Sequence, residues 1–217
     1  MESIVLIRLS PRKLHRGFSL IEVLIAMVVM SIGMLGIAGL QVATAKFQQG
    51  SRVRGMLAPM LSDIASRIRI NPDQAGDNGA TGATYTSSYA LSDTWDMQQS
   101  ATLTVSKYCE EDGVSCSTSE RSSYDMTTWR QRLRAAVPQG AALVSGDRAS
   151  GFQVTFMWLD KSLTDKGNAS DSMLIKAPVC STAIEATDSN RMGQQNCCPT
   201  EAGAPEGVRC NRFTFIP

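Results

Sequence analysis

The feature that most constrains this chain is an apolar stretch of 23 residues near its start. Residues 18–40 read FSLIEVLIAMVVMSIGMLGIAGL and carry one charge, that of Glu22. A helix of this length extends about 34 Å at about 1.5 Å per residue, which is enough to cross a hydrocarbon core of about 30 Å. No second stretch of this kind occurs in the 217 residues. The sequence therefore predicts a single-pass membrane protein.

Basic residues precede the apolar stretch: residues 1–17 hold four of them and a single acid. The positive-inside rule then places the N-terminus in the cytoplasm and everything after Leu40 on the periplasmic or external side. An ordinary secretory signal is cut after its apolar core. Here the core is long enough to remain as an anchor, so we expect processing before it. The alternative is an uncleaved signal anchor, which needs no special junction.

The junction itself has a distinctive sequence. Residues 17–22 read GFSLIE, with the carboxylate of Glu22 five positions after Gly17. A carboxylate within an apolar span costs on the order of 2.5–3.5 kcal/mol at mid-membrane, and less near its end, so it invites a functional explanation. The junction resembles the G-F-[ST]-L-[IL]-E motif of type IV pilins and pseudopilins at all six positions. The resemblance implies that an inner-membrane prepilin peptidase cuts between Gly17 and Phe18 and then N-methylates Phe18.

The cut gives Glu22 a chemical role. It would create a positive amino terminus at Phe18, at the start of a helix packed among apolar neighbours. A carboxylate one helical turn along can pair with the ammonium group of a neighbouring subunit, which neutralises both charges where the dielectric constant is low. This pairing would fix the axial register, because a misplaced subunit leaves a charge unpaired. The simpler alternative is that Glu22 only reaches the membrane interface and benefits from the helix N-terminus.

Three glycines interrupt the apolar stretch at three-residue intervals, namely Gly33, Gly36 and Gly39. Each costs a helix roughly 1 kcal/mol relative to alanine. Close helix packing is one interpretation, although the spacing is not GxxxG. In pilins this part of the helix stretches or melts inside the filament, and the resemblance implies the same flexibility here.

The helix is predicted to continue past the membrane as an amphipathic segment. Apolar residues recur there at intervals of three and four, and Asn71-Pro72 ends the pattern. Pro59 lies inside it and should kink it. The expected organisation is a leader that is removed, a transmembrane half-helix, an amphipathic periplasmic half-helix and a globular pilin head: residues 1–17, 18–40, 41–71 and 72–217.

The head is predicted to be α+β, with a small antiparallel sheet against the long helix. Residues 72–100 are rich in small and polar residues and are expected to be a connecting region. The predicted strand over residues 152–159 places alternate apolar side chains on one face, namely those of Phe152, Val154, Phe156 and Trp158. The predicted elements are a helix over 125–136 that stops at Pro138, strands over 141–145 and 152–159 around a hairpin loop, and shorter strands over 103–105 and 213–216.

All six cysteines lie in the C-terminal half: Cys109, Cys116, Cys180, Cys197, Cys198 and Cys210. An even number on one side of a membrane segment indicates an oxidising compartment and disulfide bonds. Adjacent cysteines bond to each other with difficulty, so Cys197 and Cys198 are expected to reach different partners, while the pairing stays open. The competing interpretation, a Cys₄ zinc site, is disfavoured because no CxxC pair occurs and the spacings are irregular.

A narrower resemblance lies at the end of the predicted helix. Residues 63–72 read DIASRIRINP and resemble the D-x-x-x-R-[MI]-R-x-N-P segment of the PilV family, the type IV pilus modification proteins. The helix with Trp129 and the strand over 152–159 also resemble that family. The resemblance implies a minor pilin, a low-abundance subunit that primes filament assembly at or near the tip. Its partners would be other minor pilins, the major pilin through the N-terminal helix, the prepilin peptidase, the inner-membrane assembly platform and, in some cases, a tip adhesin.

Two alternatives remain. One is a pseudopilin of a type II secretion system, which the leader does not distinguish from a pilin. The other is a membrane-anchored periplasmic enzyme or receptor. Against an enzyme, the one histidine, His15, lies in the leader, so the mature chain would lack Ser-His-Asp, Cys-His and His-ligated metal sites. A net charge of +1 gives no argument for nucleic acid. We expect no catalytic residue, cofactor or metal.

Overall fold

The structure, a computed structural model, describes residues 17–76, 87–161, 163, 173–181 and 192–217. The chain divides into two compact units, Met1–Gln48 and Gln49–Pro217, and each is described here by itself. The predicted α+β fold, with a long N-terminal helix, a small antiparallel sheet and a disulfide-linked C-terminal region, is confirmed.

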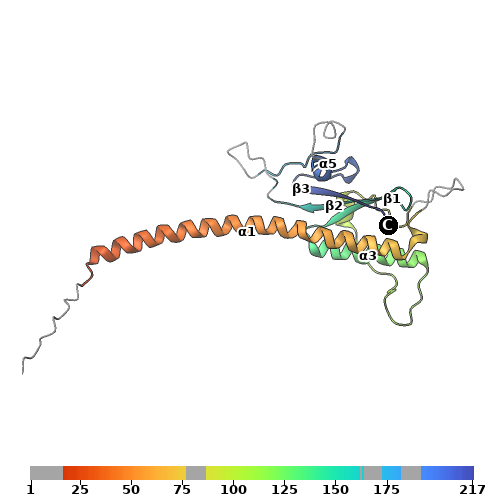
Figure 1. Ribbon diagram of the computed structural model, residues 1–217, viewed down its shortest axis with the longest axis horizontal. Coiled ribbons are helices and arrows are strands. Elements are labelled where there is room, and N and C mark those ends of the chain that lie inside the picture. The colour runs from red at the N-terminus through yellow and green to blue at the C-terminus, as the bar shows by residue number, and fades with distance from the viewer. Residues whose placement is uncertain (1–16, 77–86, 162, 164–172, 182–191) are drawn as a thin grey trace, which may run out of the picture. The chain divides into compact units, whose positions relative to one another are not determined.

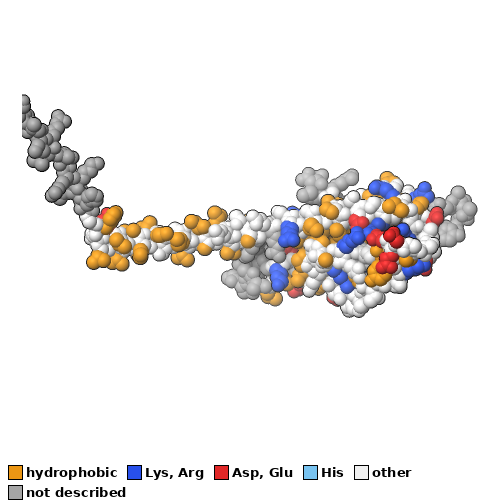
Figure 2. Space-filling view, turned by 90° about the horizontal axis from the view of Figure 1, so that it is seen from below, with side chains coloured by type: hydrophobic (Ala, Val, Ile, Leu, Met, Phe, Trp, Pro, Cys, Tyr) orange, Lys and Arg blue, Asp and Glu red, His pale blue; other side chains and the backbone are white. Residues whose placement is uncertain are grey.

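The long N-terminal helix, α1, begins at Leu20 and ends at Ile70 (Figure 1). Its first turn is closed by the carbonyl of Ser19, which accepts the backbone N–H groups of Glu22 and Val23 at 3.0 and 3.2 Å. The helix is continuous through Pro59, and the predicted kink there stays a prediction. Hydrophobic side chains cover the N-terminal stretch of α1 on the face shown in Figure 2. By length and composition, α1 is the one described helix that could span a membrane.

The second unit is built on a three-stranded antiparallel sheet. Strands β1 (Ala141–Asp147), β2 (Gly151–Leu159) and β3 (Val208–Phe215) lie in the order β1-β2-β3. The C-terminal half of α1 and helix α3 (Thr118–Ala136) lie on one face of this sheet (Figure 1).

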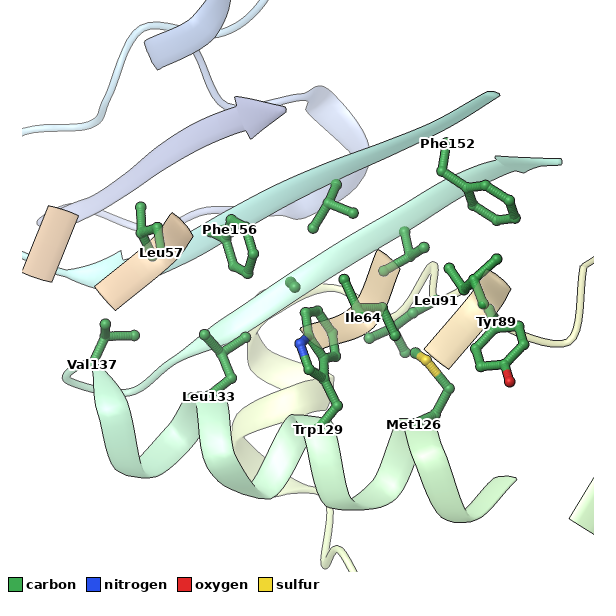
Figure 3. Close-up of a cluster of buried hydrophobic side chains, with 14 of the residues drawn as sticks. Leu57, Ile64, Tyr89, Leu91, Met126, Trp129, Leu133, Val137, Phe152 and Phe156 are labelled. Carbon is green, nitrogen blue, oxygen red and sulfur yellow. The ribbon is translucent and has the colours of Figure 1, made fainter. Parts of the chain in front are cut away.

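The main hydrophobic core lies between these helices and the inner face of the sheet (Figure 3). The alternating side chains predicted for β2 are all buried, and those of Phe152, Val154 and Phe156 are at most 1% exposed. Trp129 of α3 packs against Phe156 and donates its indole N–H to the carbonyl of Met60 at 2.9 Å. Each such large apolar side chain contributes about 1.5–3 kcal/mol on burial, so the sheet and both helices are joined in one core.

The outer face of the sheet carries a second, smaller core. Ala141, Leu143, Met157, Val208 and Cys210 lie beneath Trp95 and segments from the C-terminal region. The covering elements are short: helix α2 (Trp95–Ser100), helix α5 (Met192–Asn196) and a 3-10 turn over Thr200–Ala202, while another 3-10 turn follows α1 at Pro72–Gln74.

Helix α3 is longer than predicted. It begins at Thr118 rather than at residue 125, because Ser117 and Glu120 form a capping box: the Ser117 hydroxyl accepts the Glu120 N–H, and the Glu120 carboxylate accepts the Ser117 N–H. The first turns are polar, so the apolar pattern on which the prediction rested starts only later.

The predicted strand over residues 103–105 is wrong, since these residues form neither strand nor helix. They run beside α3 instead, where Gln131 and Arg134 donate to the carbonyls of Leu103 and Ala101, each at 2.9 Å. Side chains of α3 thus supply the hydrogen bonds that a neighbouring strand would have given. The connecting region over 72–100 also contains α2. The side chain of Thr94 caps the N-terminus of this helix. Residues 77–86 of the region lie outside the described residues.

Candidate functional site

The predicted cleavage point lies just before the long helix. Gly17, Phe18 and Ser19 precede α1 and have no regular secondary structure. Phe18 is 83% exposed, so among the described residues neither packing nor a helical hydrogen bond covers the Gly17–Phe18 peptide bond. The basic leader over residues 1–16 lies outside the described residues. An exposed, non-helical bond next to a stable helix is a favourable substrate for a peptidase.

Glu22 lies in the first turn of α1, one turn after Phe18. The position is exposed, and among the described residues Glu22 forms no ion pair. A carboxylate there is favoured by the partial positive charge of the helix N-terminus. The chain itself offers no cation to Glu22 within the described part, which is the arrangement that pairing with a second subunit requires.

The three glycines of the apolar stretch have no packing role within this chain. A Cβ atom added at Gly33, Gly36 or Gly39 would meet no other atom within 4 Å. Their cost to the helix is therefore not offset by any close contact inside the chain. Flexibility of α1 or contact with another chain would account for it.

The segment over residues 63–72 forms a polar network at the end of α1. Arg67 donates from Nη1 to Asp125 Oδ1 of α3 at 2.6 Å and from Nε to Asp63 Oδ1 at 2.9 Å. Asp63 also pairs with Arg132 at 3.1 Å. Burial lowers the pKa of Arg67, but hydrogen bonds and charges from Asp63 and Asp125 outweigh it and leave the pKa raised. This network holds α1 against α3.

Asn71 extends the network to a third segment. Its side-chain amide donates to the Thr118 carbonyl at 2.8 Å and to the Tyr89 hydroxyl at 3.1 Å, and that hydroxyl donates to Asp125 Oδ2 at 3.0 Å. Burial and the charge of Asp125 raise the pKa of Tyr89, although the Asn71 bond opposes this. Asp63, Arg67 and Asn71 recur every four residues, which puts them on one side of the chain. The motif residues thus have a structural use, which is to hold the last turns of α1 against α3 and the segment at Tyr89.

Sequence reasoning missed Tyr89 and Asp125, the partners that complete this network. Tyr89 falls in a segment expected to be a connection, and Asp125 was placed only as the start of a predicted helix. A buried tyrosine within a run of small polar residues is a weak signal. No spacing rule links it to residues 36 positions away.

The six cysteines form three disulfides: Cys109–Cys116, Cys180–Cys197 and Cys198–Cys210. Adjacent Cys197 and Cys198 therefore reach different partners. Cys198–Cys210 ties the C-terminal segment to β3, and Cys180–Cys197 ties it to the segment before it. All six sulfurs are used, so none is free as a thiolate for the alternative zinc site. The described residues hold no group of three or more His, Cys, Asp or Glu suited to a metal ion.

Comparison with known proteins bears on the N-terminal segment. A family model described as the prokaryotic N-terminal methylation motif matches residues 12–38, which include the junction and the first turns of α1. No curated protein and no solved structure matches the chain. The methylation motif and the fold support a type IV pilin-like or pseudopilin subunit, a structural protein rather than an enzyme. The long apolar helix fits a membrane-anchored protein of this kind.

Proposed function

We propose that this chain is a minor pilin of the PilV kind, which helps to prime and assemble type IV pili as a low-abundance subunit at or near the tip. The carrying observation is the junction over residues 17–22, which lies within the matched methylation motif and extends from the exposed residues before α1 into its first turn. A pilus role rather than a secretion role rests on the resemblance of residues 63–72 to the PilV segment.

Maturation begins with a prepilin peptidase that hydrolyses the Gly17–Phe18 bond and then methylates the new amine of Phe18. Gly17, Phe18 and Ser19 are exposed, which supports access of the peptidase to this bond. Residues 1–17 are the leader, residues 18–40 the membrane anchor, residues 41–71 the amphipathic part of the helix, and residues 72–217 the head. The N-terminus starts in the cytoplasm and the head lies in the periplasm, where three disulfides can form.

Assembly then places the Phe18 amine of one subunit beside Glu22 of its neighbour in a low-dielectric helix bundle. Two unpaired charges there are unfavourable, whereas a pair neutralises both. The partners are the major pilin and other minor pilins, brought together by the inner-membrane assembly platform, and in some systems a tip adhesin. Gly33, Gly36 and Gly39 would let α1 adapt to the packing of the filament.

A deletion strain of the producing bacterium tests this function. We expect loss of surface filaments and twitching motility, restored by the wild-type gene, with normal export of secreted enzymes. Lost export with normal twitching would assign the protein to a type II secretion system as a pseudopilin. If both were normal, neither filament role would hold, and a membrane-anchored receptor or enzyme would take their place.

A further inference from the structure

A cavity of about 610 Å³ opens on the outer face of the sheet. This face changes character along the strands. One row of residues across the sheet is buried in the smaller core: Ala141, Met157 and Cys210. The second row along from it is polar and consists of Ser145, Gln153 and Thr214. Between these two rows lie Leu143, Thr155 and Arg212. The cavity lies over the polar half, beside Cys180 and the turn at Thr200.

Arg212 of β3 lines this cavity and is the only cation among its described lining residues. Its Nη2 donates to Gln153 Oε1 at 3.0 Å, and its Nη1 lies 3.4 Å from both the Gln194 carbonyl and Cys180 Sγ. Sulfur is a weak acceptor. The Nε–H is buried and has no hydrogen-bond acceptor among the described residues. A guanidinium with five donors is therefore only partly satisfied here.

Two other partly buried arginines of the head are matched by carboxylates, Arg67 by Asp63 and Asp125 and Arg209 by Asp160, and Arg134 donates to two backbone carbonyls, those of Ala101 and Gln98. Arg212 has no such partner among the described residues. A cation withdrawn from water is favourable only when it is paired. The one carboxylate that lines the same cavity, that of Glu201, is exposed and forms no ion pair with a described residue.

We propose that this cavity binds a carboxylate carried by a peptide segment of a partner protein, with Arg212 as the group that receives it. A guanidinium fork matches the two oxygens of a carboxylate. The hydroxyl groups of Ser145, Thr155 and Thr200 can bond the neighbouring peptide groups. The volume falls within the range of about 300–1,000 Å³ that is usual for ligand sites.

Other ligand classes fit this cavity less well. With one cation and one anion among the described lining residues, it suits a single negative charge better than the double charge of a phosphate. None of those lining residues is aromatic, so a nucleobase would find no ring to stack on. The proposal concerns the head alone and does not depend on which filament the subunit serves.

The test uses the full chain in detergent micelles, labelled with ¹⁵N-arginine, at constant ionic strength. The probes are two matched peptide pairs, acetyl-Gly-Asp-Gly-amide against acetyl-Gly-Asn-Gly-amide, and acetyl-Gly-Ala-Ala with a free against an amidated C-terminus. We expect saturable shifts of the Arg212 Nε resonance with the acidic member of at least one pair. The pair that responds tells whether the carboxylate comes from a side chain or from a chain end. Equal shifts from acid and amide, or none from either acid, would overturn the proposal.

Two variants and a control complete the test. In protein labelled with ¹⁵N-glutamine and followed through the Gln153 side-chain amide, Arg212→Gln should weaken carboxylate binding about tenfold or more. Arg148→Gln, at an exposed arginine of the β1–β2 turn, should leave binding unchanged. Because Arg212→Gln can perturb folding, Glu201→Gln at the exposed rim provides the second variant. It removes a like charge and should tighten binding. Unchanged or weaker binding in Glu201→Gln, or tighter binding of inorganic phosphate than of the acidic peptide, would contradict the proposed ligand class.

Discussion

Arg67 near the end of α1 donates a 2.6 Å hydrogen bond to Asp125 of α3, across 58 residues of sequence. Both side chains are withdrawn from water, at 10% and 5% exposure. The Tyr89 hydroxyl donates to the other carboxylate oxygen of Asp125. Asp63 accepts a hydrogen bond from the Nε of Arg67. The end of α1 is therefore joined to α3 by a buried ion pair as well as by apolar packing.

Removing one partner of this pair should cost much more than removing an exposed charge. Asp125→Ala leaves Arg67, in a partly buried position, with Asp63 and the more distant carboxylate of Glu110 at 3.9 Å, and we expect a loss of about 3 kcal/mol in the free energy of unfolding. Arg148→Ala, at an exposed turn, should change it by about 0.5 kcal/mol or less. Chemical denaturation of the full chain in micelles measures both. Similar losses for the two variants would show that the pair has no special role.

The disulfides of the C-terminal segment should stabilise the cover of the outer sheet face. Replacing Cys198 and Cys210 together by serine opens a bond that spans 12 residues, for which chain entropy gives about 3 kcal/mol. Denaturation midpoints, compared with those of the wild type under oxidising conditions, provide the measurement. An unchanged midpoint would mean that the apolar contacts of Val208 and Met157 hold this layer without the bond.

The capping box makes a prediction about pH. The Ser117 N–H, which is the larger cause, and the Lys107 ammonium hold the pKa of Glu120 below its usual value. A carboxyl whose folded pKa is depressed stabilises the fold above its unfolded pKa of about 4.5, and this contribution is lost as the pH falls through the lower folded pKa. NMR titration should therefore give Glu120 a midpoint below about 4.5. A midpoint at or above that value would contradict the capping geometry.

The glycines of α1 make a prediction that separates helix stability from filament formation. Replacing Gly33, Gly36 and Gly39 by alanine should stabilise the isolated helix by roughly 1 kcal/mol per position, and the space around each can accept a methyl group. If the helix must stretch or melt in the filament, the triple variant should be processed normally yet yield fewer pili, as counted by electron microscopy. If the triple variant formed as many pili as the wild type, filament formation would not require the flexibility of α1.

The carboxylate of Glu22 has its own assembly test. Glu22→Gln keeps the size and polarity of the side chain but removes the charge that would neutralise the Phe18 amine of a neighbour. We expect normal cleavage and little or no incorporation into filaments, measured by immunoblots of sheared pili. Glu111→Gln, in an exposed head loop, is the matched control. Equal incorporation of both variants would refute the pairing role.

Much of the fold could be predicted because its signals are local. The apolar run and the later three-and-four spacing define α1, and the alternation from Phe152 to Trp158 defines β2. The start of α3 was missed because a polar first turn has no apolar period, and its signal lies instead in Ser117 and Glu120. The prediction of a strand at 103–105 was wrong because strand propensity does not show which groups will donate hydrogen bonds to the backbone carbonyls.

The candidate site likewise has one part that is visible in the sequence and one part that is not. The residues of the N-terminal junction are contiguous, so their motif is visible in the sequence. The partners of Arg67 and the cavity around Arg212 come from segments that only the folded head brings together. Arg212 and Thr155 face each other because of strand register, which no motif encodes.

The proposed function depends first on cleavage of the Gly17–Phe18 bond by a prepilin peptidase. Intact-mass and N-terminal mass spectrometry of the protein purified from membranes of its own bacterium tests this most directly. The account predicts a chain that begins at Phe18, carries one methyl group on its amine and retains all three disulfides. A chain that keeps residues 1–17, or one cut after the apolar stretch at Leu40 or beyond, would contradict it.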